Sequence, residues 1–273
     1  MLDGSHLPTL QRSRGRASAS FAHLRGAVRL VDLHQSGSAR IMLPRTAGPV
    51  PEAVFLNTSG GLTDGDTLSF GLHIGEGARV LATTQTSERA YAARRDAAQV
   101  SVTATVLAGG RLDWLPQETI LYDRSALTRR TVVDMAADAR LLMLEMLVLG
   151  RAAMGERVQS LDLFDRREVR RGGRVTLVDP LRLTADNLTG QSVILGDHSA
   201  MASLVLVAGD AALRLEAVRH SLARVAGVEA GASAWDGKLT VRILAPSGFA
   251  LRRAVLAALG PLRQGPLPRV WQI

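Results

Sequence analysis

The stretch TLSFGLHI, Thr67–Ile74, alternates apolar side chains with polar or small ones. On an extended chain its apolar side chains share one face: Leu68, Phe70, Leu72 and Ile74. A period of two is typical of a strand with one buried face, whereas an amphipathic helix repeats every three to four residues. The stretch therefore predicts a β-strand.

The same alternation occurs on both sides of this stretch. It recurs at residues 100–106, and the glycine-rich turns GEG and AGG follow the two runs. Further strands are predicted at residues 79–84, 119–122, 131–135, 141–148, 174–178, 203–207 and 239–244. The fold class that these runs predict is mainly β, with one large β structure.

The period changes in the last part of the chain. Apolar residues recur at helical spacing between residues 211 and 225, which predicts a helix. A second helix is predicted to begin after Ser247, a favourable N-cap, and to end at about Leu259, because Gly260 and Pro261 follow. We expect one domain over residues 1–273, with about residues 1–14 lacking ordered structure.

The composition limits the class of protein. The hydrophobic share of 47% and the charged share of 21% are typical of folded globular chains. The net charge of +8 comes almost entirely from scattered arginines, and with only 4% aromatic residues we expect no nucleic-acid partner. The absence of cysteine excludes a disulfide framework and a thiolate metal site.

Neither a secretory signal nor a membrane span is apparent. The first residues contain no continuous apolar stretch, and the longest apolar run, residues 141–149, is interrupted by Glu145. A membrane-spanning helix needs about 20 apolar residues. We therefore expect no membrane association and a cytoplasmic protein.

The segment NTSGGLTDGDTL, residues 57–68, is rich in glycine and aspartate. It lacks the Gly-Lys-Ser/Thr ending of a P-loop and the third oxygen ligand and distant glutamate of an EF-hand, and a strand rather than a helix follows it. A simpler structural interpretation is that its glycines adopt positive φ angles while its aspartates cap backbone amides. The glycines concerned are Gly60, Gly61 and Gly65.

Two other acidic residues stand in apolar surroundings. Glu145 lies in LLMLEMLVLG and either points to solvent or lines an internal polar cavity, where a carboxylate can hold water or a divalent cation. Asp179, in VTLVDPLRL, raises the same question, although a residue before proline often begins a turn. The residues alone leave these alternatives open.

Six sequence blocks together resemble the family of urease accessory proteins called UreD, or UreH in some organisms. They are GRASASF, NTSGGLTDGD, ARVLATTQTSERAYAA, WLPQETILYDRSAL, MLVLGRAAMGE and LPRVW, which follow one another from about Gly15 to Trp271. Each block is weakly specific by itself, but their common order is characteristic.

The resemblance implies a scaffold rather than an enzyme. Members of the family take part in nickel delivery to urease: they bind the urease structural subunits and the accessory protein UreF, and UreF recruits the GTPase UreG. The implied protein binds no cofactor tightly, and Ni²⁺ passes through it transiently. The implied fold is largely β, with strands wound helically in layers and two helices near the C-terminus.

The resemblance also implies positions along an internal metal passage. Asp66 and Glu145 correspond to acidic positions of the family, Asp179 occupies a comparable one, and Asp64 belongs to the same loop. Oxygen ligands pass a hydrated cation without trapping it, so no tight metal site is expected. On this basis, neutral replacements of similar size should preserve the fold and partner binding but lower urease activation.

One further block predicts a partner-binding surface. TTQTSERAYAARRD contains Thr86, Glu88, Tyr91 and Arg94, which suit the polar rim of an interface and are equally compatible with a solvated face.

The alternative from another class is a metal-dependent hydrolase. It would hold its metal on the acidic loop of Asp64 and Asp66, and it predicts turnover by the isolated protein.

Overall fold

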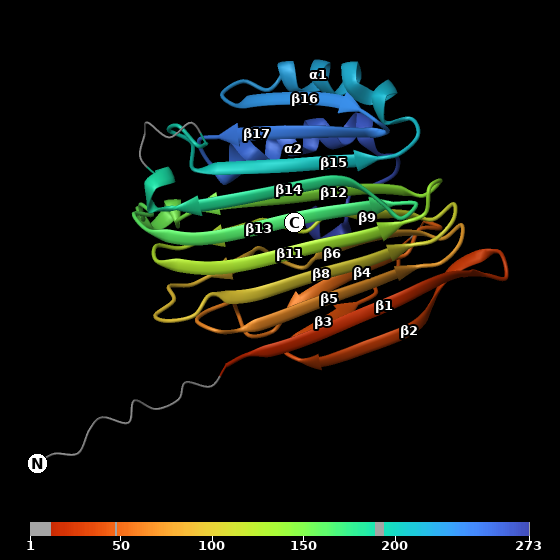
Figure 1. The fold of residues 1–273 in the computed structure, drawn as a ribbon, viewed down its shortest axis with the longest axis horizontal. Helices are drawn as coiled ribbons and strands as arrows, with labels where there is room; N and C mark the ends of the chain where they lie inside the picture. The colour runs from red at the N-terminus through yellow and green to blue at the C-terminus, as the bar shows by residue number, and fades with distance from the viewer. Residues whose placement is uncertain (1–11, 47, 189–193, 273) are drawn as a thin grey trace, which may run out of the picture.

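The computed structural model describes residues 12–46, 48–188 and 194–272. Within these residues the strands form two sheets, one of seven strands and one of ten, which we call sheet A and sheet B. Figure 1 shows the strands stacked one above another, from β1 and β2 at one end to β15, β16 and β17 at the other.

The strands of sheet A, in their order across the sheet, are β14 (Arg174–Thr184), β13 (Leu161–Arg171), β11 (Ser125–Met135), β8 (Ala98–Val106), β5 (Thr67–Ile74), β1 (Arg14–Leu24) and β2 (Ala27–Gly37). Those of sheet B are β16 (Glu229–Trp235), β17 (Lys238–Ala245), β15 (Ala200–Val207), β12 (Arg140–Leu149), β9 (Arg111–Trp114), β6 (Arg79–Thr84), β4 (Glu52–Asn57) and β3 (Ala39–Met42). Two short strands, β7 (Glu88–Ala90) and β10 (Thr119–Leu121), pair with each other, and β10 also pairs with β12.

The central strands are wound as a solenoid. From β4 to β13 the chain passes repeatedly between sheet B and sheet A, and each return adds a parallel strand beside the previous one. Antiparallel strands lie at the ends, such as β2 beside β1 and β14 beside β13. The predicted fold class, mainly β with helically wound layers, is confirmed.

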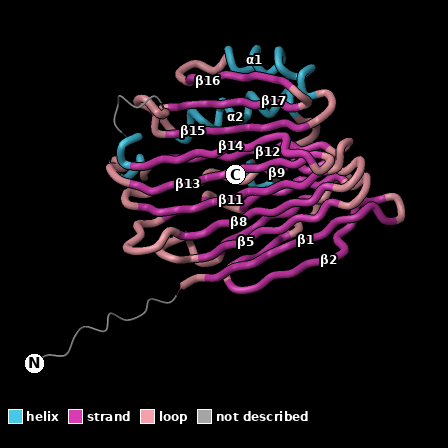
Figure 2. The backbone as a smooth tube through the Cα atoms, in the orientation of Figure 1, coloured by secondary structure: helices cyan, strands magenta, loops and turns pink. Residues whose placement is uncertain are grey.

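The α-helices of the described part of the chain are α1 (Leu215–Ala223) and α2 (Gly248–Leu262), as expected near the C-terminus. Figure 2 shows both helices at one end of the stacked strands, beside β15, β16 and β17. Short 3₁₀ segments lie at Ala152–Met154, Ala185–Leu188, Ala211–Arg214 and Arg269–Trp271.

The predicted start of the second helix is confirmed, but its predicted end is wrong. The Ser247 side chain accepts a hydrogen bond from the Ala250 amide at 3.3 Å, as an N-cap does. The helix continues through Pro261 to Leu262. A proline near the last turn removes only one backbone donor, and burial of Leu262 keeps that turn against the core.

The sequence did not predict β1, which begins at Arg14, within the segment expected to lack order. Its inward positions include Ala17 and Ala19, small side chains that give a weak apolar signal but fit beneath the opposite sheet. Residues 1–11, to which the rest of that expectation applies, lie outside the described residues.

Two apolar layers hold the molecule together. One lies between the sheets and contains Phe55, Phe70 and Trp114, and the other lies between sheet B and the helices and contains Leu142 and Val255. β12 is therefore buried on both faces, since its residues alternate between the two layers. Any polar residue on the odd-numbered positions of β12 faces the space between the sheets.

Candidate functional site

A buried arginine joins the two sheets. Arg129 of β11 lies 2.8 Å from the Glu145 carboxylate of β12 through its Nη1 atom. The same guanidinium donates two hydrogen bonds to Asp165 of β13, at 3.2 and 2.8 Å, and one to the Thr119 hydroxyl at 3.1 Å. All four side chains are buried, so Arg129 forms two desolvated ion pairs, of which the one with Asp165 is also bidentately hydrogen-bonded.

The ion pairs continue toward the edge of the sandwich. Arg167, also of β13, lies 3.2 Å from Asp179 of β14. Asp179 in turn pairs at 2.6 Å with Arg242 of β17, whose guanidinium also contacts the Ser203 hydroxyl. Asp165 lies 3.9 Å from the Arg167 side chain and so links the ion pairs of Arg129 to those of Asp179. We call this set the buried network.

Burial and pairing shift the pKa values of Glu145 and Asp165, the two carboxyls that contact Arg129, in opposite directions. Burial raises the pKa of Glu145, the nearby Asp165 carboxylate raises it further, and the single contact with Arg129 does not compensate. Burial acts in the same direction on Asp165, but the charge and the bidentate hydrogen bonds of Arg129 outweigh it and lower the pKa of Asp165. Ionised Asp165 therefore holds Arg129, and Glu145 is the carboxyl that gains a proton more easily.

A cavity of about 40 Å³ lies beside the buried network, between the sheets. Its apolar wall includes Phe70 and Trp114, and its polar wall includes Glu88, Arg129 and Glu145. A single water molecule occupies roughly 10–15 Å³ by this measure, so the cavity holds a few water molecules. The buried indole N–H of Trp114 points to the Glu145 carboxyl without well-aligned hydrogen-bond geometry, and its effect is to lower the pKa of Glu145 slightly.

A second cavity, of about 30 Å³, lies beside the first and nearer the surface. The two share Phe70, Thr84 and Glu88, and the outer one is also lined by Asn57 and by Thr86, which is exposed. Glu88 is therefore the carboxyl at the junction of the two cavities.

The environment of Glu88 differs from that of the buried network. Its carboxylate accepts hydrogen bonds from the Asn57 amide at 3.2 Å and from the Arg89 backbone N–H at 3.1 Å, but it forms no ion pair with any residue in the described part of the chain. Burial is the largest cause that raises the pKa of Glu88 to about 7, and Asp66 adds to it. This side chain exchanges a proton near neutral pH.

The two aspartates of the loop at residues 57–68 are bound to backbone amides. Asp66 accepts from the N–H of Ser13 at 2.7 Å and of Thr63 at 2.9 Å, one on each oxygen. Asp64 accepts from the N–H of Asp96 at 2.5 Å and of Arg95, and its second oxygen pairs with Arg12 at 3.2 Å. The structure therefore places these carboxylates in backbone-fixing roles.

The glycines of the loop have the conformation that those contacts require. Gly60, Gly61 and Gly65 all have positive φ. At Gly61 an added Cβ would lie 2.3 Å from the ring of Tyr91, so the loop can approach β7 only with glycine there. The Tyr91 hydroxyl donates to the Gly60 carbonyl at 3.2 Å.

The residues predicted for partner binding differ in their exposure to solvent. Thr86, Tyr91 and Arg94 are exposed, whereas Glu88 is partly buried in the cavity wall. Of the acidic residues predicted for a passage, Glu145 and Asp179 belong to the buried network, and the two loop aspartates do not.

The sequence interpretation missed the basic half of the buried network. Arg129 falls on the buried phase of SALTRRTVVDM together with Leu127 and Val133, and Asp165 and Arg167 fall on the buried phase of LDLFDRREVRR. The period-two pattern thus contained a usable signal, namely charges of both signs at inward positions of neighbouring strands.

In the described residues, no cluster of three or more His, Asp or Glu side chains is arranged to hold a metal ion. In residues 12–46, 48–188 and 194–272, no helix has the length and apolar character needed to cross a membrane.

Comparison with known proteins identifies the family. The model of the family described as UreD urease accessory protein matches residues 13–272. The chain belongs to the UreD family. A UreD protein of Cereibacter sphaeroides is 56% identical over 265 residues, covering 96% of each chain. A UreD protein of Jannaschia is 51% identical over 274 residues, covering all of both chains, and one from Rhizobium leguminosarum bv. trifolii is 42% identical over 96% of each.

The resemblance inferred from six sequence blocks is therefore confirmed. Membership of the UreD family makes this chain a urease accessory protein, and its relatives are named as accessory proteins rather than enzymes. The buried network and the two cavities are thus features of a UreD-family solenoid, and their role has to be considered in urease maturation.

Proposed function

We propose that this protein is a cytoplasmic scaffold of urease maturation that binds the urease structural subunits and UreF, with UreG joined through UreF. In this proposal Ni²⁺ is the cargo, and it passes between the sheets without a tightly bound resting site. Urease maturation is the part of the proposal that family membership supports directly.

The observation that carries the passage is the position of Glu88. It lines both the outer cavity, near exposed Thr86, and the inter-sheet cavity that reaches Glu145. Because its pKa is about 7, Glu88 can release a proton when a cation approaches and regain it when the cation leaves. Oxygen donors of this kind favour transfer over retention of Ni²⁺.

The contacts of the other acidic residues change how the proposal should be tested. Asp66 uses both oxygens on backbone amides, and Glu145 and Asp179 contact arginines. A neutral replacement at these positions alters the fold and the local charge together, so reduced urease activation would have two explanations. Glu88 has no ion pair to lose among the described residues, so a neutral replacement there distinguishes an effect on metal transfer from an effect on the fold.

The test is co-expression of the full chain with UreF, UreG and the urease subunits, followed by copurification, nickel analysis and urease assay. The Glu88→Gln variant should assemble with its partners but give urease with severalfold less nickel and activity. Glu76→Gln, the same change at an exposed glutamate, is the matched control and should behave as the parent.

The outcomes separate the two parts of the proposal. If the parent chain is recovered without any partner, the scaffold is wrong. If the complexes form and Glu88→Gln loads urease as well as the control does, the passage through Glu88 is wrong while the scaffold stands.

A further inference from the structure

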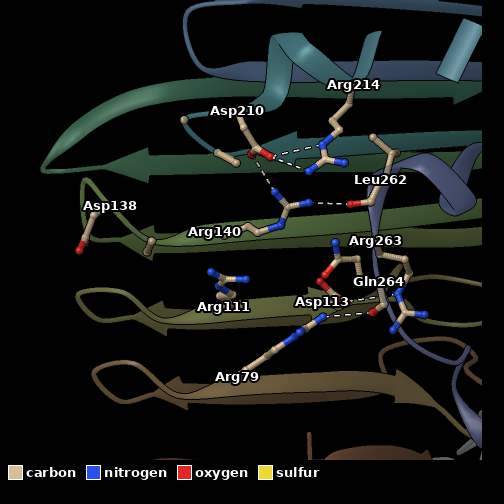
Figure 3. Close-up of a pocket in the computed structure, with 13 residues that line it drawn as sticks. Arg79, Arg111, Asp113, Asp138, Arg140, Asp210, Arg214, Leu262, Arg263 and Gln264 are labelled. Carbon is tan, nitrogen blue, oxygen red and sulfur yellow. Dashed lines mark hydrogen bonds and ion pairs between the residues drawn. The ribbon is translucent and has the colours of Figure 1, made fainter. Parts of the chain in front are cut away.

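A polar hollow separate from the two inter-sheet cavities lies on sheet B where β6, β9 and β12 begin. Its volume is about 250 Å³, and Figure 3 shows the side chains that line it. Each of the three strands starts with an arginine, and these are paired across the sheet: Arg79 with Arg111, and Arg111 with Arg140. We call this hollow the arginine cleft.

The strand register brings like charges close together. Neighbouring strands are about 4.8 Å apart, so three arginines in register form a ladder of positive charge. Like charges on directly opposite residues destabilise a sheet unless counter-charges are present.

Part of that charge is neutralised within the protein. Arg140 pairs with Asp210 at 2.9 Å and donates to the Leu262 carbonyl at 2.6 Å. Arg263 pairs with Asp113 at 3.2 Å, and Arg214 shares Asp210 with Arg140. These contacts occupy two of the three aspartates that line the cleft.

The third aspartate lowers the net charge of the cleft but does not contact the remaining arginines. Asp138 accepts a hydrogen bond from the Gly109 backbone N–H at 3.0 Å, and Figure 3 shows it apart from the arginines. Among the described residues that line the cleft there are five arginines and three aspartates, so the excess is two positive charges.

The excess charge is localised on two neighbouring side chains. In the described part of the chain, the guanidinium of Arg111 forms no hydrogen bond or ion pair, and the guanidinium of Arg79 donates only to the Gln264 backbone carbonyl, at 3.1 Å. Figure 3 shows Arg111 between Arg79 and Arg140, and all three side chains line the hollow.

We propose that the arginine cleft binds the phosphate group of a small molecule, or free phosphate, on Arg79 and Arg111. A phosphate dianion matches the excess of two positive charges. The planar fork of a guanidinium donates two parallel hydrogen bonds to an oxyanion, so two adjacent arginines supply a complete set for one phosphate.

The neighbouring groups restrict what else can bind. The aspartates in the lining limit the net positive charge of the cleft to two, which favours one compact anion over an extended polyanion such as nucleic acid. Burial lowers the pKa of Arg140 despite the opposing effect of Asp210, which indicates that this wall of the cleft is poorly solvated. Electrostatic attraction is stronger in such surroundings than on an open surface.

The proposal concerns residues outside the inter-sheet cavities and does not depend on nickel transfer. It is tested with the full chain by thermal unfolding and isothermal titration, using inorganic phosphate, with sodium chloride at matched ionic strength as the reference. Phosphate should raise the melting temperature of the parent by a few degrees when it exceeds its dissociation constant.

The variant is Arg111→Gln, which removes an exposed guanidinium that has no partner among the described residues and should leave the fold unchanged. It should weaken phosphate binding by about tenfold or more, because charge-assisted hydrogen bonds are lost. Arg224→Gln, the same change at an exposed arginine outside the cleft, should bind phosphate as the parent does.

A second ligand identifies the source of the phosphate group. Glycerol phosphate that binds as well as inorganic phosphate indicates a site for phosphate esters, and binding of inorganic phosphate alone indicates a site for the free ion. The proposal is overturned if phosphate protects the parent no better than sodium chloride, or if Arg111→Gln and Arg224→Gln weaken binding equally.

Discussion

The loop at residues 57–68 and the space between the sheets both withdraw carboxylates from solvent, but they satisfy them differently. In the loop, Asp66 is bound by two backbone amides. Between the sheets, Asp165 and Glu145 share the guanidinium of Arg129. Glu88, beside both regions, accepts hydrogen bonds from the Asn57 side chain and from one backbone N–H, but it forms no ion pair with an arginine within the described residues.

The difference teaches what each carboxylate can do. Amide-bound aspartates fix the backbone, and arginine-bound carboxylates hold the two sheets together at the cost of desolvation. Only a carboxyl without a strong fixed partner is free to exchange a proton or bind a passing cation near neutral pH. Measurements that remove one partner at a time test this distinction.

The largest effect is expected from the arginine of the buried network. Arg129→Met leaves Glu145 and Asp165 together without their shared cation, and such uncompensated buried charge costs about 3–5 kcal/mol. Urea unfolding of the full chain measures the loss. Arg130→Gln, at the exposed neighbouring position of β11, should stay within about 0.5 kcal/mol of the parent. Equal effects of the two variants would contradict a structural role for the network.

A pH-dependent effect is expected from Glu88. Its pKa rises from 4.5 in the unfolded chain to about 7 in the folded protein, so the folded state holds an extra proton between these values. Stability therefore falls as the pH rises through this window, and above it the folded state has lost at most about 3 kcal/mol.

Glu88→Gln removes this dependence. The variant should be more stable than the parent at pH values above the window and should show a smaller change in unfolding free energy across it. Unfolding curves measured at several pH values, with Glu76→Gln as the control, provide the comparison. If the unfolding free energy of the parent rises between pH 4.5 and 7, and rises with the same slope in Glu88→Gln, then the pKa of Glu88 is not about 7.

The smallest effect is expected in the loop. Asp66→Asn replaces one acceptor oxygen by an N–H₂ group that faces a backbone donor, which should cost about 1–3 kcal/mol. Thermal or urea unfolding measures the cost, and Asp32→Asn on the exposed edge strand β2 is the matched control. A loss no larger than that of the control would mean that the amide contacts of Asp66 contribute little.

The site could be predicted only in part. The acidic blocks directed attention to Glu145, Asp179 and the loop aspartates, and the alternative that loop aspartates cap amides was available from spacing alone. The partners were harder to find, because Arg129 and Asp165 are 36 residues apart in the chain. They become neighbours only when β11 and β13 pair in one particular register.

The sequence by itself determined the local structure and the family. Alternation in Thr67–Ile74 required a strand because only an extended chain puts its apolar residues on one face, and Ser247 marked the start of α2 by its capping chemistry. Six blocks in their characteristic order indicated the UreD family.

Tertiary structure decided which charges meet. Glu145 had no local signal for its direction, because β12 is buried against sheet A on one face and the helices on the other. Winding of the solenoid turned it toward Arg129 and left Glu88 at the cavity junction, and strand register aligned Arg79, Arg111 and Arg140. The physical reason is that electrostatic partners depend on distance in space, and the packing of distant strands sets that distance.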